Sequence, residues 1–282
     1  MLVLEEERSQ QHLPSVKLKP ISFGDRIRLS DADARVHGKD VPGGNALEAA
    51  AQKQCYRIAE LQRVLYADGH RALLIVLQGR DASGKDGTIR KVFTEVNPQG
   101  CEVTSFKAPS DTEQRHDFLW RVHARVPAHG MIGIFNRSHY EDVLVPRVHG
   151  TMKKREWLAR YDQINEFEQL LTESGTLVVK FMLHISRDEQ KARLIERLTD
   201  KTKNWKFRAG DLDDRALWGQ YTKAYRGVLE HTSTGDAPWY VVPADDKDVR
   251  NWLIARTIAD RLEDLDLSYP RAEKGVLELK IV

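Results

Sequence analysis

The sequence of 282 residues contains only two cysteines and no long run of apolar residues. Cys55 and Cys101 lie far apart and belong to no CxxC or Cys/His pattern, so we expect reduced, packed thiols rather than a disulfide or a metal site. No apolar run approaches the roughly 20 residues that a membrane-spanning helix needs, which argues against an integral membrane protein. The start, MLVLEEERSQ, places acids directly after a very short apolar stretch and does not resemble a secretory signal.

An excess of charge of either sign is also missing, because 44 lysines and arginines stand against 42 acids, for a formal net charge of +2. A general nucleic-acid binder carries a large basic excess, so this balance argues against that class but allows a local basic groove for another polyanion. Apolar residues make up 41% of the chain, enough for a full core. We therefore expect a folded cytoplasmic protein with no nucleic-acid or membrane partner.

Five short apolar runs alternate with helical patterns along the chain. The first, ALLIVLQ, is apolar almost throughout, which is typical of a strand buried on both faces of a sheet. Strands that alternate with helices in this way predict an α/β fold, in which a parallel sheet has right-handed crossovers and helices on both faces. The predicted strands cover residues 72–78, 102–106, 131–135, 176–185 and 238–244.

Helices are predicted between these runs. Asn45 is expected to cap a helix that continues to about Gly69, and Ser186 is expected to cap the helix after the fourth strand. Others are predicted over 86–96 and 111–126, between the third and fourth strands, and after the fifth strand. The predicted organisation is an N-terminal extension at 1–44, one α/β domain at 45–266 and a C-terminal tail at 267–282.

The strongest chemical signal, GRDASGKDGT, follows the first predicted strand and leads into a helix. The G-x4-G-K spacing in this context is typical of a phosphate-binding P-loop, and we call residues 79–85 the phosphate loop. Gly79 and Gly84 let the backbone turn so that several N–H groups converge on one phosphate, at the positive end of the helix dipole. Lys85 can reach a phosphate oxygen. The alternative is an ordinary glycine-containing turn between a strand and a helix.

Two acids set this loop apart from the usual pattern, in which Ser or Thr follows the lysine and holds Mg²⁺. Here that residue is Asp86, and Asp81 lies inside the loop. Carboxylates repel phosphate, but they become favourable when Mg²⁺ lies between them, because this ion prefers carboxylate and phosphate oxygens. The loop is therefore predicted to bind metal-bridged phosphate.

A second polar cluster, NRSHYED, follows the third predicted strand. Ligands of open α/β sheets bind at the carboxyl ends of the strands, so this cluster is expected to face the phosphate loop. Arg137 can clamp phosphate with two N–H groups, and Glu141 and Asp142 are candidate metal or nucleotide contacts. Alternatively, the two acids mark a solvated helix start that the helix dipole favours. His139 is expected to be a structural hydrogen-bonding residue.

A third cluster holds six cations and one tryptophan in RLIERLTDKTKNWKFRAGD, between two predicted helices. Such a segment is typical of a lid that grips phosphate and excludes water, and the lid is predicted at about 187–225. An ordinary charged helix–loop–helix surface is the alternative. Additional cations at Arg90, Lys107 and Arg121 suit transfer between two polyanions. The cluster consists of Arg193, Arg197, Lys201, Lys203, Trp205, Lys206 and Arg208.

Nine stretches occur in a fixed order over roughly residues 45–265: GRDASGKDGTIRKV, VNPQG, SFKAPS, HDFLWRVH, GMIGIFNRSHYEDVLV, KFMLHIS, RLTDKTKNWKF, RALWGQYTKAY and APWYVVPAD. Together they resemble the polyphosphate kinase 2 family. The resemblance implies a P-loop kinase-type three-layer fold with a five-stranded parallel sheet and a helical lid. It also implies reversible, Mg²⁺-dependent transfer of a phosphoryl group between inorganic polyphosphate and a nucleotide, with Mn²⁺ as an alternative ion.

The resemblance further implies roles for single residues. Asp81 would orient the metal and the accepting phosphate, Lys85 would neutralise the transferred group, and Arg137 would hold phosphate. Arg197 would close over the polyphosphate chain together with two lysines of the lid, Lys203 and Lys206.

Two positions qualify this pattern. Asn136 stands where some members of the family have Asp, whereas Asp86, unusual for a P-loop, is normal in the family. The predicted metal ligands are Asp81 and Asp142. The predicted phosphate or nucleotide contacts are Gly79, Ala82, Ser83, Gly84, Asp86, Gly87, Thr88, Arg90, Lys107, Asn136, Glu141, Lys203 and Lys206.

The expected acceptor rests on Glu141. The sequence reads HYED rather than the WYNR type of diphosphate-specific relatives, and is similar to members that phosphorylate both AMP and ADP. We expect a dual-acceptor enzyme that makes ADP and ATP, accepts guanine nucleotides as a further option and forms a homodimer or homotetramer. The alternatives are a polyphosphate kinase for one acceptor only, an ATP-dependent nucleoside monophosphate kinase, and a non-catalytic nucleotide switch.

Overall fold

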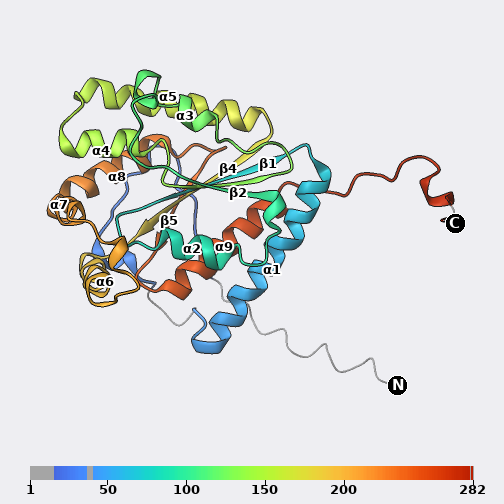
Figure 1. Cartoon of the computed structure of the whole chain (residues 1–282), viewed down its shortest axis with the longest axis horizontal. Coiled ribbons are helices and arrows are strands. Elements are labelled where there is room, and N and C mark those ends of the chain that lie inside the picture. Colours follow the sequence, from blue (N-terminus) through green and yellow to red (C-terminus); the bar gives the residue numbers. More distant parts are fainter. Residues whose placement is uncertain (1–15, 37–40, 280, 282) are drawn as a thin grey trace.

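The computed structural model describes residues 16–36, 41–279 and 281. Five parallel strands form one sheet in the order β2-β3-β1-β4-β5 (Figure 1). Each predicted strand is present, with its ends shifted by no more than one residue. The strands are β1 (Ala72–Gln78), β2 (Cys101–Ser105), β3 (Ile132–Asn136), β4 (Thr176–His184) and β5 (Trp239–Pro243).

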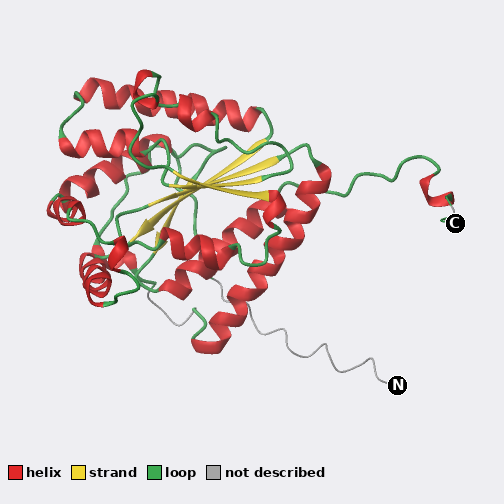
Figure 2. Cartoon of the chain, viewed as in Figure 1, coloured by secondary structure: helices red, strands yellow, loops and turns green. Residues whose placement is uncertain are grey.

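Helices cover both faces of this sheet, which confirms the predicted three-layer α/β fold (Figure 2). On one face lie α1 (Gly44–Asp68), α2 (Lys85–Val92) and α9 (Lys247–Glu263), and on the other α3 (Trp120–His123), α4 (Glu141–His149), α5 (Lys154–Glu173) and α8 (Trp218–Thr232). The helices α6 (Arg187–Thr199) and α7 (Gly210–Ala216) complete the set within the described residues.

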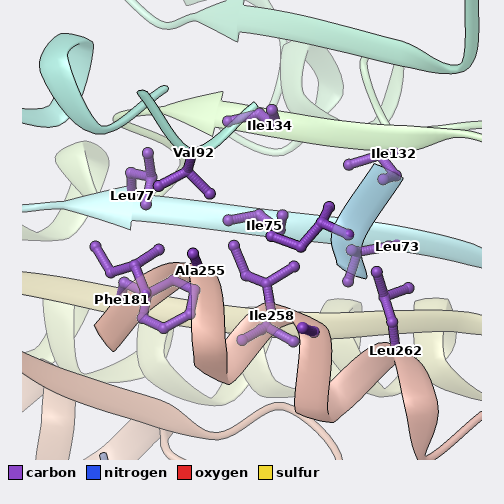
Figure 3. Close-up of a cluster of buried hydrophobic side chains, with 14 of the residues drawn as sticks. Leu73, Ile75, Leu77, Val92, Ile132, Ile134, Phe181, Ala255, Ile258 and Leu262 are labelled. Carbon is purple, nitrogen blue, oxygen red and sulfur yellow. The ribbon is translucent and has the colours of Figure 1, made fainter. Parts of the chain in front are cut away.

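The central strand β1 is buried on both sides, which explains its continuous apolar sequence. Leu73, Ile75 and Leu77 point into a core that α9 closes with Ile258 and Leu262 (Figure 3). The intervening residues Leu74 and Val76 point into the core on the opposite face. Successive side chains of a strand alternate between its faces, so each core needs apolar residues at every second position and the two together need an unbroken run.

The predicted helix over residues 111–126 is wrong. The segment forms a 3-10 turn at Glu113–Arg115 and the single-turn helix α3. Ser110 exchanges hydrogen bonds with Glu113, and the Asp117 carboxylate accepts the Leu119 N–H at 3.0 Å. Such local bonds from Ser and Asp to the backbone start separate turns instead of one long helix.

Two other helix ends differ from expectation. α1 begins at Gly44, with Gly43 in the capping position rather than Asn45. α2 ends at Val92 instead of continuing to residue 96. The Ser186 cap is confirmed, since its side chain accepts the Glu189 N–H at 3.2 Å.

Part of the predicted N-terminal extension packs against the sheet. The Ile21 N–H donates to the O of Trp239, the first residue of β5, at 2.9 Å, and Arg35 binds Asp245 at 2.9 Å. Both cysteines are free thiols, as expected. Within the described ranges, every helix is too short or too polar to cross a membrane.

A fully buried ion pair joins β4 to α5. The Lys180 ammonium contacts the Glu168 carboxylate and donates to Tyr140 Oη at 2.9 Å and to Thr232 O at 2.7 Å. Glu168 also accepts from Tyr140 Oη at 2.9 Å and lies 3.2 Å from His139 Nε2. His139 is thus a buried structural residue, as predicted, and the network holds the segment that follows β3.

Removing one partner of this pair leaves the other charge buried without compensation. Glu168→Gln is therefore expected to lower the free energy of unfolding by about 3–5 kcal/mol, measured by urea denaturation. The control is Glu60→Gln, which removes an exposed pair with Arg63 and is expected to cost less than about 1 kcal/mol. Equal losses in the two variants would contradict the assignment.

Candidate active site

The phosphate loop connects β1 to α2, and the NRSHYED segment follows the neighbouring strand β3. Parallel strands end at the same edge of a sheet, so the two segments meet there, as the sequence predicts. The Arg137 N–H donates to Leu77 O at 3.0 Å, and the Arg137 guanidinium binds Asp81 at 2.6 Å. The phosphate loop and the NRSHYED segment together form the candidate active site.

Both glycines of the loop are required by its shape. Gly79 has φ +151° and Gly84 has φ +102°, a region that L side chains rarely adopt. A Cβ on Gly79 would lie 2.6 Å from Leu183 O, and one on Gly84 would lie 2.0 Å from Arg250 Nη1. Gly84 occupies the N-cap of α2, so the turn delivers the start of this helix to the site.

Lys85 is buried and turned back onto its own loop. Its ammonium donates to Gly79 O at 2.7 Å and to Arg80 O at 3.3 Å. Burial lowers the pKa of Lys85 to about 8, and the nearby Arg137 adds to this shift. The lysine is thus held at the centre of the loop by carbonyl dipoles, in a setting that favours an anionic partner.

Arg137 joins the loop to the second polar cluster. Its Nη2 donates to Asp81 Oδ1 at 2.6 Å and its Nη1 to Glu141 Oε2 at 2.9 Å. The coulombic field of Glu141 raises the pKa of Arg137 although burial opposes this. Arg137 has φ +62°, which costs a non-glycine residue free energy and is typical of functional positions.

Glu141 is held from a second side. The Gln78 amide satisfies both of its neighbours when its nitrogen faces Glu141, 2.9 Å from Oε1, and its oxygen faces the Ser138 N–H at 3.1 Å. Glu141 is therefore part of the site rather than a solvated acid at a helix start.

The other acids lie at separate places. Asp86 accepts from Asn136 Nδ2 at 2.7 Å, which links the loop to the end of β3. Asp142 binds Arg121 at 3.2 Å, whereas Asp81 binds Arg137. Among the described residues, no three His, Cys, Asp or Glu side chains gather as ligands of a metal ion.

The cations of the predicted lid are mostly paired with acids. Arg197 binds Asp211 at 3.3 Å, and Lys203 binds Glu196 at 2.6 Å. Lys206 lies 3.7 Å from Asp86 Oδ2, directly after the loop, and Arg193 bonds to the loop backbone itself. The segment predicted as a lid therefore lies beside the loop, and the acid partners of its cations differ in burial.

The remaining predicted contacts divide into buried and exposed residues. Ser83 and Thr88 are fully buried, and Thr88 Oγ1 lies 3.4 Å from Asn251 Oδ1. Ala82 is buried at φ +62°, and Gly87 follows in the first turn of α2. Arg90 and Lys107 are exposed, and no side-chain bond from either to the phosphate loop is found in the described residues.

Three arginines of the site escape the sequence patterns. Arg193, which the sequence assigns to the lid cations, is buried in the second turn of α6 and bonds to the loop backbone. Arg250 of α9 binds Ser83 O from 167 positions away, so no local spacing reveals it. Arg80 lies inside the quoted motif, yet nothing in the motif shows that its side chain is buried.

Arg80 fastens the loop to α8. Its guanidinium stacks on the Trp218 ring at 4.0 Å and donates to Thr222 Oγ1 at 2.7 Å. Burial lowers its pKa to about 10. Next to it is a cavity lined by Gly79, Arg80, Asp81, Arg137, Glu141, Leu144, Gln190, Asp214, Tyr221 and Tyr225.

Comparison with known proteins identifies the family. The family model described as Polyphosphate kinase 2 (PPK2) matches residues 44–270. The chain belongs to the polyphosphate kinase 2 family. It is thereby an α/β kinase, as the resemblance of its motifs implied.

Two curated relatives in this family match most of the chain. The AMP/ADP-polyphosphate phosphotransferase of Meiothermus ruber is 52% identical over 248 residues, which cover 88% of this chain and 91% of the relative. The ADP-polyphosphate phosphotransferase of Rhodopseudomonas palustris is 47% identical over 229 residues, covering 77% and 79%. The crystal structure of Polyphosphate Kinase 2 from Arthrobacter aurescens superimposes with a TM-score of 0.82 at 43% identity, covering 93% of this chain and 97% of that one.

The lowered pKa of Lys85 predicts weaker phosphate binding at high pH. With a pKa of about 8, Lys85 is mainly an ammonium at pH 7 and mainly neutral at pH 9. If only the ammonium form binds, the dissociation constant of pyrophosphate is expected to be about tenfold higher near pH 9 than near pH 7. Titration calorimetry over this range measures it. Lys85→Arg stays charged and corrects for ionisation of the ligand itself; parallel pH profiles in the two proteins would disprove the shift.

Proposed function

We propose that the chain transfers the terminal phosphoryl group of inorganic polyphosphate to AMP and ADP, making ADP and ATP. The observation that carries this proposal is the ion-pair bridge from Asp81 through Arg137 to Glu141, set beside Lys85 of the phosphate loop. A phosphate clamp that is itself flanked by carboxylates suits two phosphate groups bridged by a cation. The printed names of the two relatives, one with AMP/ADP and one with ADP, support the same chemistry.

The transfer is an in-line displacement. A terminal phosphate oxygen of the nucleotide attacks the end phosphorus of polyphosphate, and the bond from that phosphorus to the bridging oxygen of the chain breaks. The polyphosphate leaves one unit shorter, and the reverse reaction restores it. A nucleotide phosphate is largely ionised near neutral pH, so positioning and charge neutralisation supply most of the acceleration. Lys85 and Arg137 hold the transferred group and offset its developing charge.

The donor set around the loop fits Mg²⁺. This ion usually takes one or two protein carboxylates and completes its shell with water and substrate phosphates, so a cluster of three acids is not needed. Asp81 and Asp142 are the proposed ligands, with Mn²⁺ as an alternative ion. When bound, the metal neutralises phosphate charge. Arg137 orients the Asp81 carboxylate, and Arg121 holds Asp142.

Polyphosphate is proposed to bind under the lid at about 187–225. Arg197, Lys203 and Lys206 would exchange their present carboxylate partners for phosphate oxygens. Gly79, Ala82, Ser83, Gly84, Asp86, Gly87 and Thr88 of the loop region, with Asn136 and Glu141 at the end of β3, would contact the reacting phosphates. The exposed Arg90 and Lys107 would contact only those parts of the polyphosphate that lie away from the reacting phosphates.

We further propose a cytoplasmic homodimer or homotetramer that also accepts guanine nucleotides. A relative from Pseudomonas aeruginosa named GDP-polyphosphate phosphotransferase, 34% identical over 72% of this chain, supports the last point.

The first test is incubation of the purified chain with Mg²⁺, long-chain polyphosphate and either AMP or ADP, followed by chromatography of the nucleotides. ATP from both acceptors, with ADP appearing first from AMP, is the expected result. Product from one acceptor alone would remove the dual assignment made from Glu141. Transfer from ATP but not from polyphosphate would identify a nucleoside monophosphate kinase, and nucleotide binding with no transfer would identify a switch.

Lys85 is expected to matter for turnover and not for folding. Lys85→Met should lower kcat by about 10²–10³-fold, the range seen when one stabilising donor of a transition state is removed. Burial disfavours the charged form of Lys85 in the folded state, so the melting temperature is expected to hold or rise. Calorimetric melting and initial rates measure both. Near-normal transfer in this variant would show that the phosphate loop is wrongly assigned.

Asp81→Asn tests the metal site. It keeps the shape of the side chain and removes the charge, so we expect at least about a tenfold lower rate and a higher Mg²⁺ concentration at half-maximal rate. The control is Asp162→Asn on the exposed surface of α5. An unchanged rate and Mg²⁺ dependence would count against Asp81 as a ligand.

A further inference from the structure

Two buried arginines from distant helices bind the backbone carbonyls of the phosphate loop. Arg193 of α6 donates through Nη1 to Ala82 O at 3.0 Å and to Ser83 O at 3.3 Å. Arg250 of α9 donates through Nη1 to the same Ser83 O at 3.2 Å. Only 7% of Arg193 and 2% of Arg250 are exposed, so both side chains contact the loop from the protein interior.

The Arg193 guanidinium uses its full set of N–H donors. Its Nη2 donates to Ala244 O at 2.8 Å and to Asp245 O at 2.7 Å, and its Nε to Glu189 Oε1 at 2.8 Å. With Ala82 O and Ser83 O this makes five acceptors for the five donors that a guanidinium has. Lysine offers three donors around a point charge and cannot reproduce the planar pattern. The site is therefore specific for arginine.

These bonds fix the direction of a peptide group in the loop. In a planar trans peptide, the C=O of one residue and the N–H of the next point to opposite sides. Two guanidinium groups that hold Ser83 O therefore hold the Gly84 N–H on the opposite side, at the N-cap of α2. Backbone N–H groups at such a junction are the phosphate ligands of a P-loop, whereas a flipped peptide would present an oxygen to the anion.

Although Glu189 pairs with Arg193, the stability of the fold does not account for placing a second cation, Arg250, at the same carbonyl. Arg193 and Arg250 share one carbonyl, and burial, with Arg193 next to it, lowers the pKa of Arg250 to about 10. Burying like charges together costs free energy that a neutral donor to the same carbonyl would avoid. Cations held close to Lys85 do, however, add to the positive field on which a phosphate would rest.

Arg193 also connects the loop to the root of the lid. It lies in the second turn of α6, whose cap Ser186 is held by Asp245 through a 2.8 Å bond from its N–H. The carbonyls of Ala244 and Asp245 that Arg193 binds belong to the turn after β5. One guanidinium thus joins three segments: the phosphate loop, the lid helix and this turn.

We propose that Arg193 is a positioning residue for phosphate binding and transfer, which orients the 82–84 peptides of the loop and fastens them to the base of the lid. Arg250 supports the same peptide from α9. Neither side chain touches the reacting atoms. The inference rests on the proposed function for its kinetic readout, but not for its binding readout.

The test compares Arg193→Ala and Arg193→Lys with Lys191→Ala, which removes an exposed cation two positions away on α6. The readouts are pyrophosphate affinity by calorimetry, kcat and KM with polyphosphate and ADP, and melting temperature. Misplacing a catalytic group by about 1 Å costs about 10²-fold, and we expect that loss in kcat/KM for both Arg193 variants. Pyrophosphate affinity is expected to fall in parallel, while Lys191→Ala stays within about twofold of the wild type.

Chemical rescue separates positioning from stability. Guanidinium chloride at millimolar concentration, far below the molar range that unfolds proteins, is expected to restore affinity and rate in Arg193→Ala, while equal NaCl is not. Hydrogen exchange of the 82–85 amides should be faster in this variant and slower again with guanidinium. If Arg193→Ala does not fold, Arg193→Lys keeps the charge and carries the comparison.

Three results would overturn the proposal. One is wild-type pyrophosphate affinity in both Arg193 variants. The second is wild-type activity in Arg193→Lys but not in Arg193→Ala, which would show that only the positive charge matters. The third is loss of affinity in step with the melting temperature and without guanidinium rescue. If the wild type binds pyrophosphate but transfers no phosphoryl group, the proposed function fails while the binding and rescue measurements still decide the role of Arg193.

Discussion

The concentration of positive charge around one short loop is the constraint on which the rest of this structure depends. Carboxylates bind Arg137 directly, whereas the Lys85 ammonium donates to two backbone carbonyls, and Arg80 contacts an aromatic ring and a hydroxyl. Dipoles compensate a buried charge incompletely, and the pKa of Lys85 is accordingly lowered to about 8. A phosphate anion bound here, as proposed, would supply the missing counter-charge, so its binding would offset a free-energy cost of folding. The cations concerned are Arg80, Lys85, Arg137, Arg193 and Arg250.

The parallel sheet makes this concentration possible. The parallel strands all have their carboxyl ends on one side of the sheet. The segments that follow β1, β3, β4 and β5 each bring one arginine to the loop: Arg80, Arg137, Arg193 and Arg250. Helix dipoles help, since α2 directs its N-terminus at the same point. The edge strand β2 contributes none of these arginines, and the segment after it supplies Lys107 at an exposed position. Residues far apart in sequence thus converge because consecutive crossovers deliver them to one side of the sheet.

The same geometry explains which parts of the fold and of the candidate site could be predicted from the sequence. The strands were predictable because burial on both faces demands unbroken apolar runs, as in β1. The phosphate loop and the segment after β3 were predictable because both their chemistry and their place after a strand are local. The Arg250 contact was not, since its partner Ser83 is 167 positions away and a single arginine in an amphipathic helix has no distinguishing pattern. The failed helix at 111–126 shows the opposite case, in which local bonds from Ser110 and Asp117 outweigh apolar spacing.

Arg193 shows what composition alone leaves undetermined in the predicted lid. In sequence it is one of six cations in a charged segment, but burial divides that segment into two kinds. Lys203 pairs with Glu196 and Asp200 near the surface, and such exposed pairs are weak enough for phosphate to replace them. Arg193 makes four hydrogen bonds to backbone carbonyls, three of them buried, which a ligand cannot exchange without leaving carbonyls unpaired. If residues 187–225 act as the proposed lid, its ion pairs toward the tip would exchange with a long polyanion while Arg193 holds its base and the phosphate loop keeps its shape.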